Sequence, residues 1–131
     1  MTTIQSIRGR LEGVREVNMH PAEQFVKQIP WSEAEKKTAR RAFEKALEMQ
    51  CTAIMAEAKQ IIANATTPFD IWRVHDYLSE QRKTVDRLYD YRYSVLLDVF
   101  SCLLRDGWLT EADLTGLRKE KIESIKIGAA L

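Results

Sequence analysis

The feature that most constrains this fold is an unbroken helical pattern from about Glu33 to Asn64. Ser32 and Glu35 have the spacing of a capping box, in which each side chain accepts a hydrogen bond from the backbone amide of the other. The helix carries an apolar stripe with steps of three or four residues: Phe43, Leu47, Cys51, Ile54, Ala58 and Ile61. About thirty helical residues extend for nearly 50 Å. A compact chain of 131 residues cannot cover so long a helix. We therefore expect the stripe to pack against another long helix, from the same chain or from a second copy.

A second long helix is predicted from Pro68 to about Tyr89. Thr67 is a suitable N-cap residue, proline is favoured at the first helical position, and the negative charge of Asp70 favours the first turn. This helix has an apolar seam of its own, formed by Ile71, Val74, Leu78, Val85 and Leu88. We expect the two long helices to pair antiparallel across the short turn between them.

The C-terminal part of the chain predicts two shorter helices. The run from Val95 to Leu104 is the most apolar in the chain but too short to span a membrane, so it predicts a buried helix that ends at Gly107. A last helix is expected to begin at the capping-box-like pair Thr110 and Asp113. Its outer face is predicted to carry charges of alternating sign: Lys119, Glu120, Lys121, Glu123 and Lys126.

No segment shows the alternation typical of strands, so the predicted fold class is all-α. The predicted molecule is a dimer with three regions in each chain. Residues 1–29 form an N-terminal extension. Residues 30–90 form a long antiparallel two-helix stalk, through which the chain dimerises. Residues 91–131 form a small C-terminal two-helix head.

The N-terminal extension gives no single structural prediction. Ile4, Ile7 and Leu11 have the spacing of one helical face, whereas Gly9 and Gly13 each disfavour a helix by about 1 kcal/mol. A helical arm and a disordered arm are equally compatible with this segment.

Composition excludes several classes of protein. The 20 basic and 19 acidic residues nearly cancel, which argues against a nucleic acid or an anionic membrane as partner and weakly favours self-association. No apolar run approaches the roughly 20 residues of a membrane span, and the first 30 residues lack the apolar core of a secretory signal. Cys51 and Cys102 have no metal-ligand spacing and are expected to be buried thiols. We expect an intracellular protein.

The chain offers few residues for catalysis. Its only histidines are His20 and His75, and it has no nucleophile elbow, phosphate-binding glycine loop or cysteine cluster. His75 and Asp76 form a His-Asp pair of the kind that holds a metal in some hydrolases, but such sites need further histidines that the chain does not supply. The expected protein is therefore not an enzyme and has no cofactor or metal. A small hydrolase that uses His75 and Asp76 is the weakest alternative.

One strip of the second helix has the composition of a recognition surface. It carries an indole, a carboxylate, a hydroxyl and a guanidinium three or four residues apart, at Trp72, Asp76, Ser79 and Arg82. A solvated helix face with a tryptophan at its edge is an equally good reading of these four residues alone.

The chain as a whole resembles the fluorescence recovery protein family of cyanobacteria. The resemblance covers residues 30–131 without gaps. It begins with Pro30-Trp31-Ser32 followed by Ala34 and Glu35, and its most specific part is the run 70–79, Asp-Ile-Trp-Arg-Val-His-Asp-Tyr-Leu-Ser, followed by Arg82. Further matching residues are Tyr89, Asp90, Arg92, Ser94, Val95, Val99, Phe100, Leu103, Leu104, Gly107 and Leu114.

The resemblance implies a regulatory protein without chromophore or enzymatic activity. Such a protein binds the photoactivated orange carotenoid protein, mainly at its C-terminal domain. It accelerates the return to the inactive orange form, and so ends photoprotective quenching at the phycobilisome. The resemblance also implies a homodimer or tetramer in the cytoplasm, peripheral to the thylakoid. By position, it places Trp72, His75, Asp76 and Arg82 at or beside the dimer interface, with Ile71 in the dimer seam.

Two departures from the family affect the expected partner contact of the head. The family pattern has a bulky aromatic side chain where this chain has Asp98. It has a basic residue near Ser124, where Lys126 is only a neighbour. Both positions are associated with partner contact, and the loss of an aromatic anchor can remove a binding hot spot. The alternative prediction is therefore a diverged helical dimer that acts as an adaptor or scaffold for an unrelated partner, in a bacterium without the phycobilisome system.

Overall fold

The computed structural model describes residues 21–131, which contain five α-helices and two short 3₁₀ helices. These elements are α2 (Pro21–Gln28), α3 (Glu33–Ala63), η1 (Pro68–Asp70), α4 (Ile71–Leu88), α5 (Leu96–Arg105), η2 (Glu111–Leu114) and α6 (Lys119–Ala130). The predicted all-α fold is confirmed. The expectations for Ile4, Ile7 and Leu11 lie outside the described residues.

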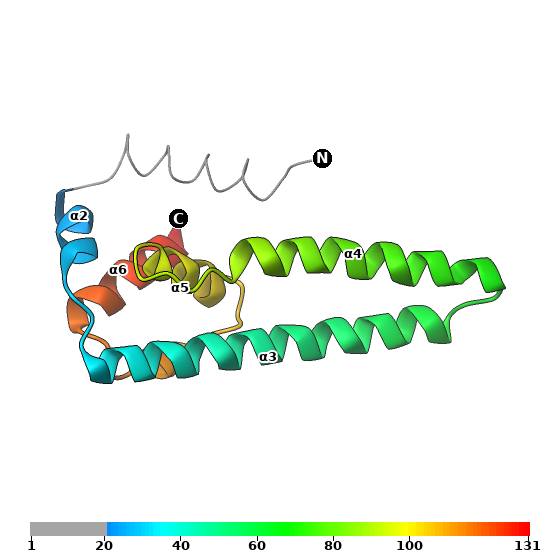
Figure 1. The fold of residues 1–131 in the computed structure, drawn as a ribbon, viewed down its shortest axis with the longest axis horizontal. Coiled ribbons are helices and arrows are strands. Elements are labelled where there is room, and N and C mark those ends of the chain that lie inside the picture. The colour runs from blue at the N-terminus through cyan, green and yellow to red at the C-terminus, as the bar shows by residue number, and fades with distance from the viewer. Residues whose placement is uncertain (1–20) are drawn as a thin grey trace.

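The helices α3 and α4 form the predicted antiparallel pair and extend together away from the other helices (Figure 1). The capping box at the start of α3 is present: Glu35 N donates to Ser32 Oγ and Ser32 N donates to Glu35 Oε1, each over 3.1 Å. At the turn before α4, Asp70 Oδ2 accepts hydrogen bonds from the backbone amides of Thr66 and Thr67. These two hydrogen bonds lower the pKa of Asp70 and hold the turn.

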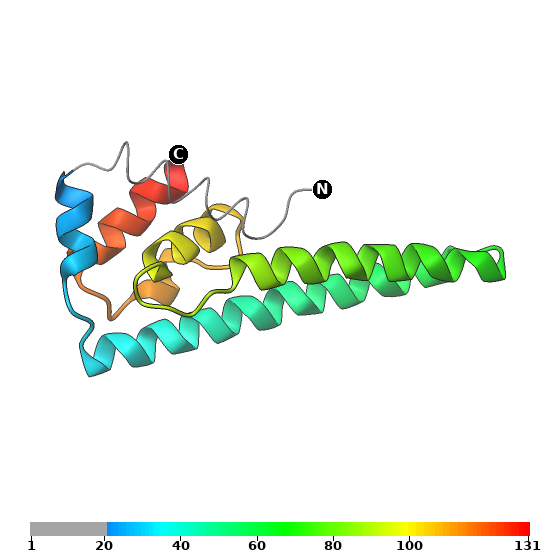
Figure 2. The ribbon, with the colours of Figure 1, turned by 45° about the horizontal axis from the view of Figure 1, so that its top comes forward.

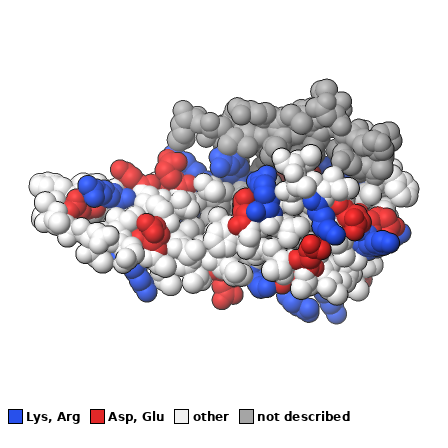
Figure 3. All heavy atoms as spheres, turned by 180° about the vertical axis from the view of Figure 1, so that it is seen from behind, with Lys and Arg blue, Asp and Glu red and all other residues white. Residues whose placement is uncertain are grey.

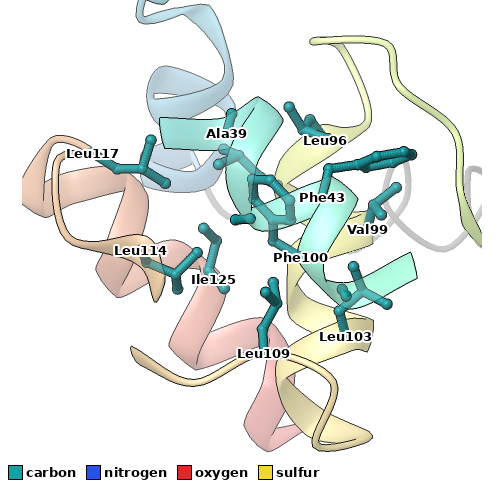
Figure 4. Packing of buried hydrophobic residues seen from close by; sticks show 13 residues of the cluster. Ala39, Phe43, Leu96, Val99, Phe100, Leu103, Leu109, Leu114, Leu117 and Ile125 are labelled. Carbon is teal, nitrogen blue, oxygen red and sulfur yellow. The ribbon is translucent and has the colours of Figure 1, made fainter. Parts of the chain in front are cut away.

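The hydrophobic core lies at one end of the molecule, where α5, η2 and α6 pack against the first half of α3 (Figure 4). Phe100 of α5 is fully buried at the centre, with Phe43 of α3 and Ile125 of α6 in the same cluster. Gln50 is the last buried residue of α3, and its side chain accepts a 2.8 Å hydrogen bond from Tyr89 Oη. The core therefore includes residues from both sides of the boundary predicted at residue 90.

The last helix begins later than predicted. The side chain of Asp113 does accept hydrogen bonds from Thr110, but this pair begins the 3₁₀ helix η2, and α6 begins only at Lys119. Gly116, between them, has a φ of +118°, and a Cβ atom there would lie 2.5 Å from Oγ1 of Thr38 on α3. The chain turns at this glycine because it must pass close to α3, and the turn interrupts the predicted helix.

The prediction that Lys121 lies on the outer face of the last helix is wrong, because its side chain is completely buried. Its Nζ donates to Glu35 Oε1 over 3.1 Å and to the carbonyl oxygen of Pro30 over 3.0 Å, and lies 3.9 Å from the centre of the Trp31 ring. A buried ammonium needs such partners to replace water. Here they come from Pro30, Trp31 and Glu35, at and just before the start of α3 and more than 80 residues away in the sequence.

We predict that Glu35 contributes to the loss of stability in acid. Burial alone would raise its pKa, but hydrogen bonds from the amides of Arg118 and Ser32 and from Lys121 outweigh this effect and lower the pKa below 4.5. The ionised form is thus favoured in the folded state. Its contribution to stability is present above pH 4.5 and is lost as the pH falls towards the folded-state pKa.

Unfolding with urea at fixed protein concentration, between roughly pH 3 and 6, tests this prediction. Glu35→Gln is expected to make the fall of the unfolding free energy with acid shallower. The control is Glu33→Gln, because the Glu33 side chain is 89% exposed. Equal slopes for the two variants would contradict the prediction.

Candidate functional site

The outer part of the stalk has no core of its own. No residue of α4 is buried, and the buried residues of α3 all lie at or before Gln50. Near the turn, Phe69, Ile71 and Trp72 are 77, 62 and 63% exposed. On the face that Figure 3 shows, charged side chains are sparser over the stalk than over the head. An apolar surface of this kind on a folded chain indicates an interaction site.

A groove of about 800 Å³ runs along the stalk between its two helices. Cys51 and Ile54 line it from α3, and His75, Leu78 and Arg82 are among the residues that line it from α4. The prediction that Cys51 is buried is wrong, since the residue is exposed here. Within residues 21–131, other members of the same α3 stripe, Leu47, Ile54, Ala58 and Ile61, are only half-buried. Cys102, in the head, is half-buried, and burial raises the pKa of its thiol.

The structure brings the predicted residues of α4 together on two adjacent strips. His75 and Arg82 line the groove, and the ring of Trp72 meets the ring of His75 edge-on at 6.2 Å between centres. Asp76 Oδ1 lies 3.4 Å from His75 Nδ1. The guanidinium Nε of Arg82 donates to both carboxylate oxygens of Asp86 over 3.1 Å, so Arg82 pairs along its own helix rather than with Asp76.

The three residues predicted for the head contact have different surroundings. Asp98 on α5 forms a 2.8 Å ion pair with Lys27 of α2. Lys126 on α6 lies 3.5 Å from Glu111 and 3.7 Å from Glu123. Ser124, also on α6, is half-buried. The ion pair of Asp98 with α2 is a contact for which the sequence pattern gave no signal.

Two further properties concern the weaker functional alternatives. His75 and Asp76 are both exposed, and within residues 21–131 no group of three or more His, Cys, Asp or Glu side chains is arranged to hold a metal ion. Over the same range, no helix combines the length and the apolar composition that a membrane span requires.

Sequence reasoning missed the way in which the segment between α4 and α5 is attached. It correctly predicted a junction at residues 89–93, but the tyrosines there also contact α3. The Arg40 guanidinium lies 4.0 Å from the centre of the Tyr91 ring, and Tyr93 packs against Trp31 at 5.3 Å. Burial, together with a hydrogen bond to Tyr93, raises the pKa of Tyr91 to about 12. These contacts hold the junction against the start of α3.

Comparison with known proteins identifies the family. Residues 31–129 match the family described as photoprotection regulator fluorescence recovery protein. The chain belongs to the fluorescence recovery protein family. One curated relative, the fluorescence recovery protein of Synechocystis sp., is 36% identical over 104 residues, which are 79% of this chain and 95% of the relative.

Solved structures of fluorescence recovery proteins share the fold. Those from Fremyella diplosiphon and from Synechocystis sp. each superpose with a TM-score of 0.73 at 36% sequence identity. Each comparison covers 78% of this chain and the whole of the other chain. The chain is thus a member of a family of photoprotection regulators, and the family match begins after α2.

Proposed function

We propose that this chain is a non-enzymatic, cytoplasmic regulatory protein that acts as a homodimer. It binds the photoactivated orange carotenoid protein and accelerates the return of that protein to its inactive orange form. Membership of the fluorescence recovery protein family carries the proposal. The exposed face of α4, with Trp72, His75 and Arg82, supplies a surface suited to protein contacts.

The homodimer part of the proposal is supported by the incomplete burial of the two stalk helices. A two-helix pair covers only the sides that face each other, and α4 has no buried residue in one chain. The stalk of a second copy, laid into the groove, would cover Cys51, Ile54 and Leu78 and complete a four-helix arrangement. Ile71, Trp72 and Asp76 would lie at or beside this interface.

The proposed mechanism is differential binding. A partner changes the rate of a conformational transition only by binding the transition state more tightly than the starting state. Each tenfold acceleration of the red-to-orange transition requires about 1.4 kcal/mol of such preference. No covalent step and no cofactor are needed. The head is proposed to take part in the contact through the surface around Asp98, Ser124 and Lys126.

The test mixes the purified protein with photoactivated orange carotenoid protein and follows its dark reversion by absorbance. The expected result is a faster reversion and a complex with the red form on a sizing column. An unchanged rate without a complex would reject the proposal. A complex without acceleration would favour the adaptor function instead.

We predict that Arg82→Ala weakens the dimer. An exposed ion pair such as Arg82–Asp86 contributes little, about 0–1 kcal/mol, but the loss of one partner from a desolvated charge pair costs about 2–5 kcal/mol. Arg82 lines the groove that the second copy is proposed to fill, so the dissociation constant is expected to rise at least tenfold. Helicity, measured by circular dichroism, should remain the same.

The matched control is Arg73→Ala. Arg73 is equally exposed, with its side chain at 76% against 79% for Arg82, and lies on the same helix, but it does not line the groove. Analytical ultracentrifugation over a concentration series measures both variants. The same dissociation constant for the two variants would show that the groove is not the dimer interface.

A further inference from the structure

The helix α2 is an addition to the family fold that lies on the head. The family match begins at Trp31, whereas α2 ends at Gln28. Nevertheless α2 packs beside α6, as Figure 2 shows, and its residue Val26 packs against the edge of the hydrophobic core. Ile29, just after the helix, is buried, with 7% of its surface exposed. The helix therefore covers part of the head surface formed by α5 and α6.

The link between α2 and α5 is an ion pair in a partly buried position. Lys27 Nζ lies 2.8 Å from Asp98 Oδ2, and the two side chains are 22 and 35% exposed. The residues are 71 positions apart, so the pair joins the N-terminal segment to the head. It bears on the proposed partner contact, because α2 occupies the surface around Asp98 to which the proposed function assigns that contact.

The short helix α2 depends on the head for its stability. An eight-residue helix is not stable in water by itself, so α2 depends on its contacts with the head. Among the described residues, these contacts include those of Val26 and Ile29 and the Lys27–Asp98 ion pair. Pro30 follows Ile29, and its carbonyl oxygen accepts a hydrogen bond from Lys121. A partner that offers the head equivalent contacts can replace such a helix.

We infer that α2 is a detachable cover, latched by the Lys27–Asp98 ion pair, that restricts access of the protein partner to the head. This inference rests on the proposed function. Since α2 meets Asp98 with a lysine beside apolar side chains, the partner element that replaces it has the same chemistry: a cationic group flanked by apolar residues. Only molecules in which α2 is released bind the partner. The apparent affinity is therefore the intrinsic affinity multiplied by the fraction of molecules in which α2 is released.

Charge reversals in the full chain test the latch. Lys27→Asp places two carboxylates together and leaves the Asp98 side chain unaltered, so it is expected to release α2 and tighten partner binding by roughly 5- to 150-fold. Asp98→Lys also releases α2, but it repels the cationic partner element, so binding is expected to fall. The double variant restores the ion pair in reverse and is expected to return α2 to the head. Gln24→Asp, on the exposed side of α2, is the matched control.

Two measurements separate the outcomes. Hydrogen exchange of the amides of Val26, Lys27 and Ile29 reports the release of α2 without any partner. Binding of photoactivated orange carotenoid protein reports the access of the partner. Unchanged exchange in Lys27→Asp would overturn the latch. Faster exchange with unchanged binding would overturn the cover but leave the proposed function intact. The absence of binding by the unaltered chain and by every variant would overturn the proposed function, and this inference with it.

Discussion

Ile71→Glu is expected to convert the protein from a dimer to a monomer. Ile71 is 62% exposed at the start of α4, in a part of the stalk where one chain buries nothing. If a second copy covers this position, the substitution places a carboxylate without a partner into an apolar interface, and a two-fold arrangement does so in both copies. The dissociation constant should rise at least a thousandfold, which corresponds to about 4 kcal/mol.

Sedimentation or size-exclusion chromatography at micromolar concentration measures this change. Ile71→Leu is the control, because it conserves volume and apolar character and is expected to leave the dimer intact. Circular dichroism distinguishes dissociation from unfolding. In α4, Leu88 packs against the edge of the head core, whereas Ile71 lies at the other end of the helix, so the substitution is expected to leave the head folded. A dimer of unchanged strength in Ile71→Glu would place the interface elsewhere on the molecule.

The second large effect is expected from Lys121→Ala, which should lower the free energy of unfolding by about 3–5 kcal/mol. The substitution leaves the Glu35 carboxylate, only 3% exposed, without the ammonium that neutralises it. It also leaves the carbonyl oxygen of Pro30 without the Lys121 hydrogen bond and removes the cation from the Trp31 ring. The start of α3 then keeps the hydrogen bond from the Arg118 amide to Glu35 but loses its ion pair with α6.

Urea unfolding of Lys121→Ala and of Lys119→Ala provides the comparison, because Lys119 lies on the same helix but is exposed. The control is expected to change stability by less than about 0.5 kcal/mol. The double variant Glu35→Gln, Lys121→Met removes both charges and is expected to recover much of the loss. A similar effect of the two alanine substitutions would show that the buried pair does not stabilise the fold.

The parts of the fold that were predicted correctly depend on neighbours in the sequence. Ser32 and Glu35 cap α3 across three residues. Thr67 is the N-cap of the short 3₁₀ helix that begins at Pro68 and leads into α4. The periodicity of α3 and α4 likewise needs only local information. The apolar run that became α5 was long enough to identify as a core helix.

The incorrect predictions depend on residues distant in the sequence. Lys121 was assigned to the outer face because charged residues alternate around it, and its partner Glu35 is 86 residues away. The predicted start of the last helix is too early, because a capping pair such as that of Thr110 and Asp113 can also begin a 3₁₀ helix. The close approach of Gly116 to Thr38, which interrupts the predicted helix, is a contact between residues distant in the sequence. The ion pair of Lys27 with Asp98 likewise joins residues that are distant in the sequence. For the candidate site, the sequence predicted a strip of α4 whose residues Trp72, Asp76 and Arg82 are exposed in the structure. It did not predict the groove, which needs α3 beside α4.

The continuity of α3 has a geometric consequence. The helix runs without a break from Glu33, beside the head, to Ala63 at the far turn, a length of roughly 46 Å. A tilt of the whole helix by about 5° about its first residue moves its far end by about 4 Å over that length. Two such helices clamped side by side would act as a rigid spacer, and the separation and orientation of the two heads would then follow from the stalk alone.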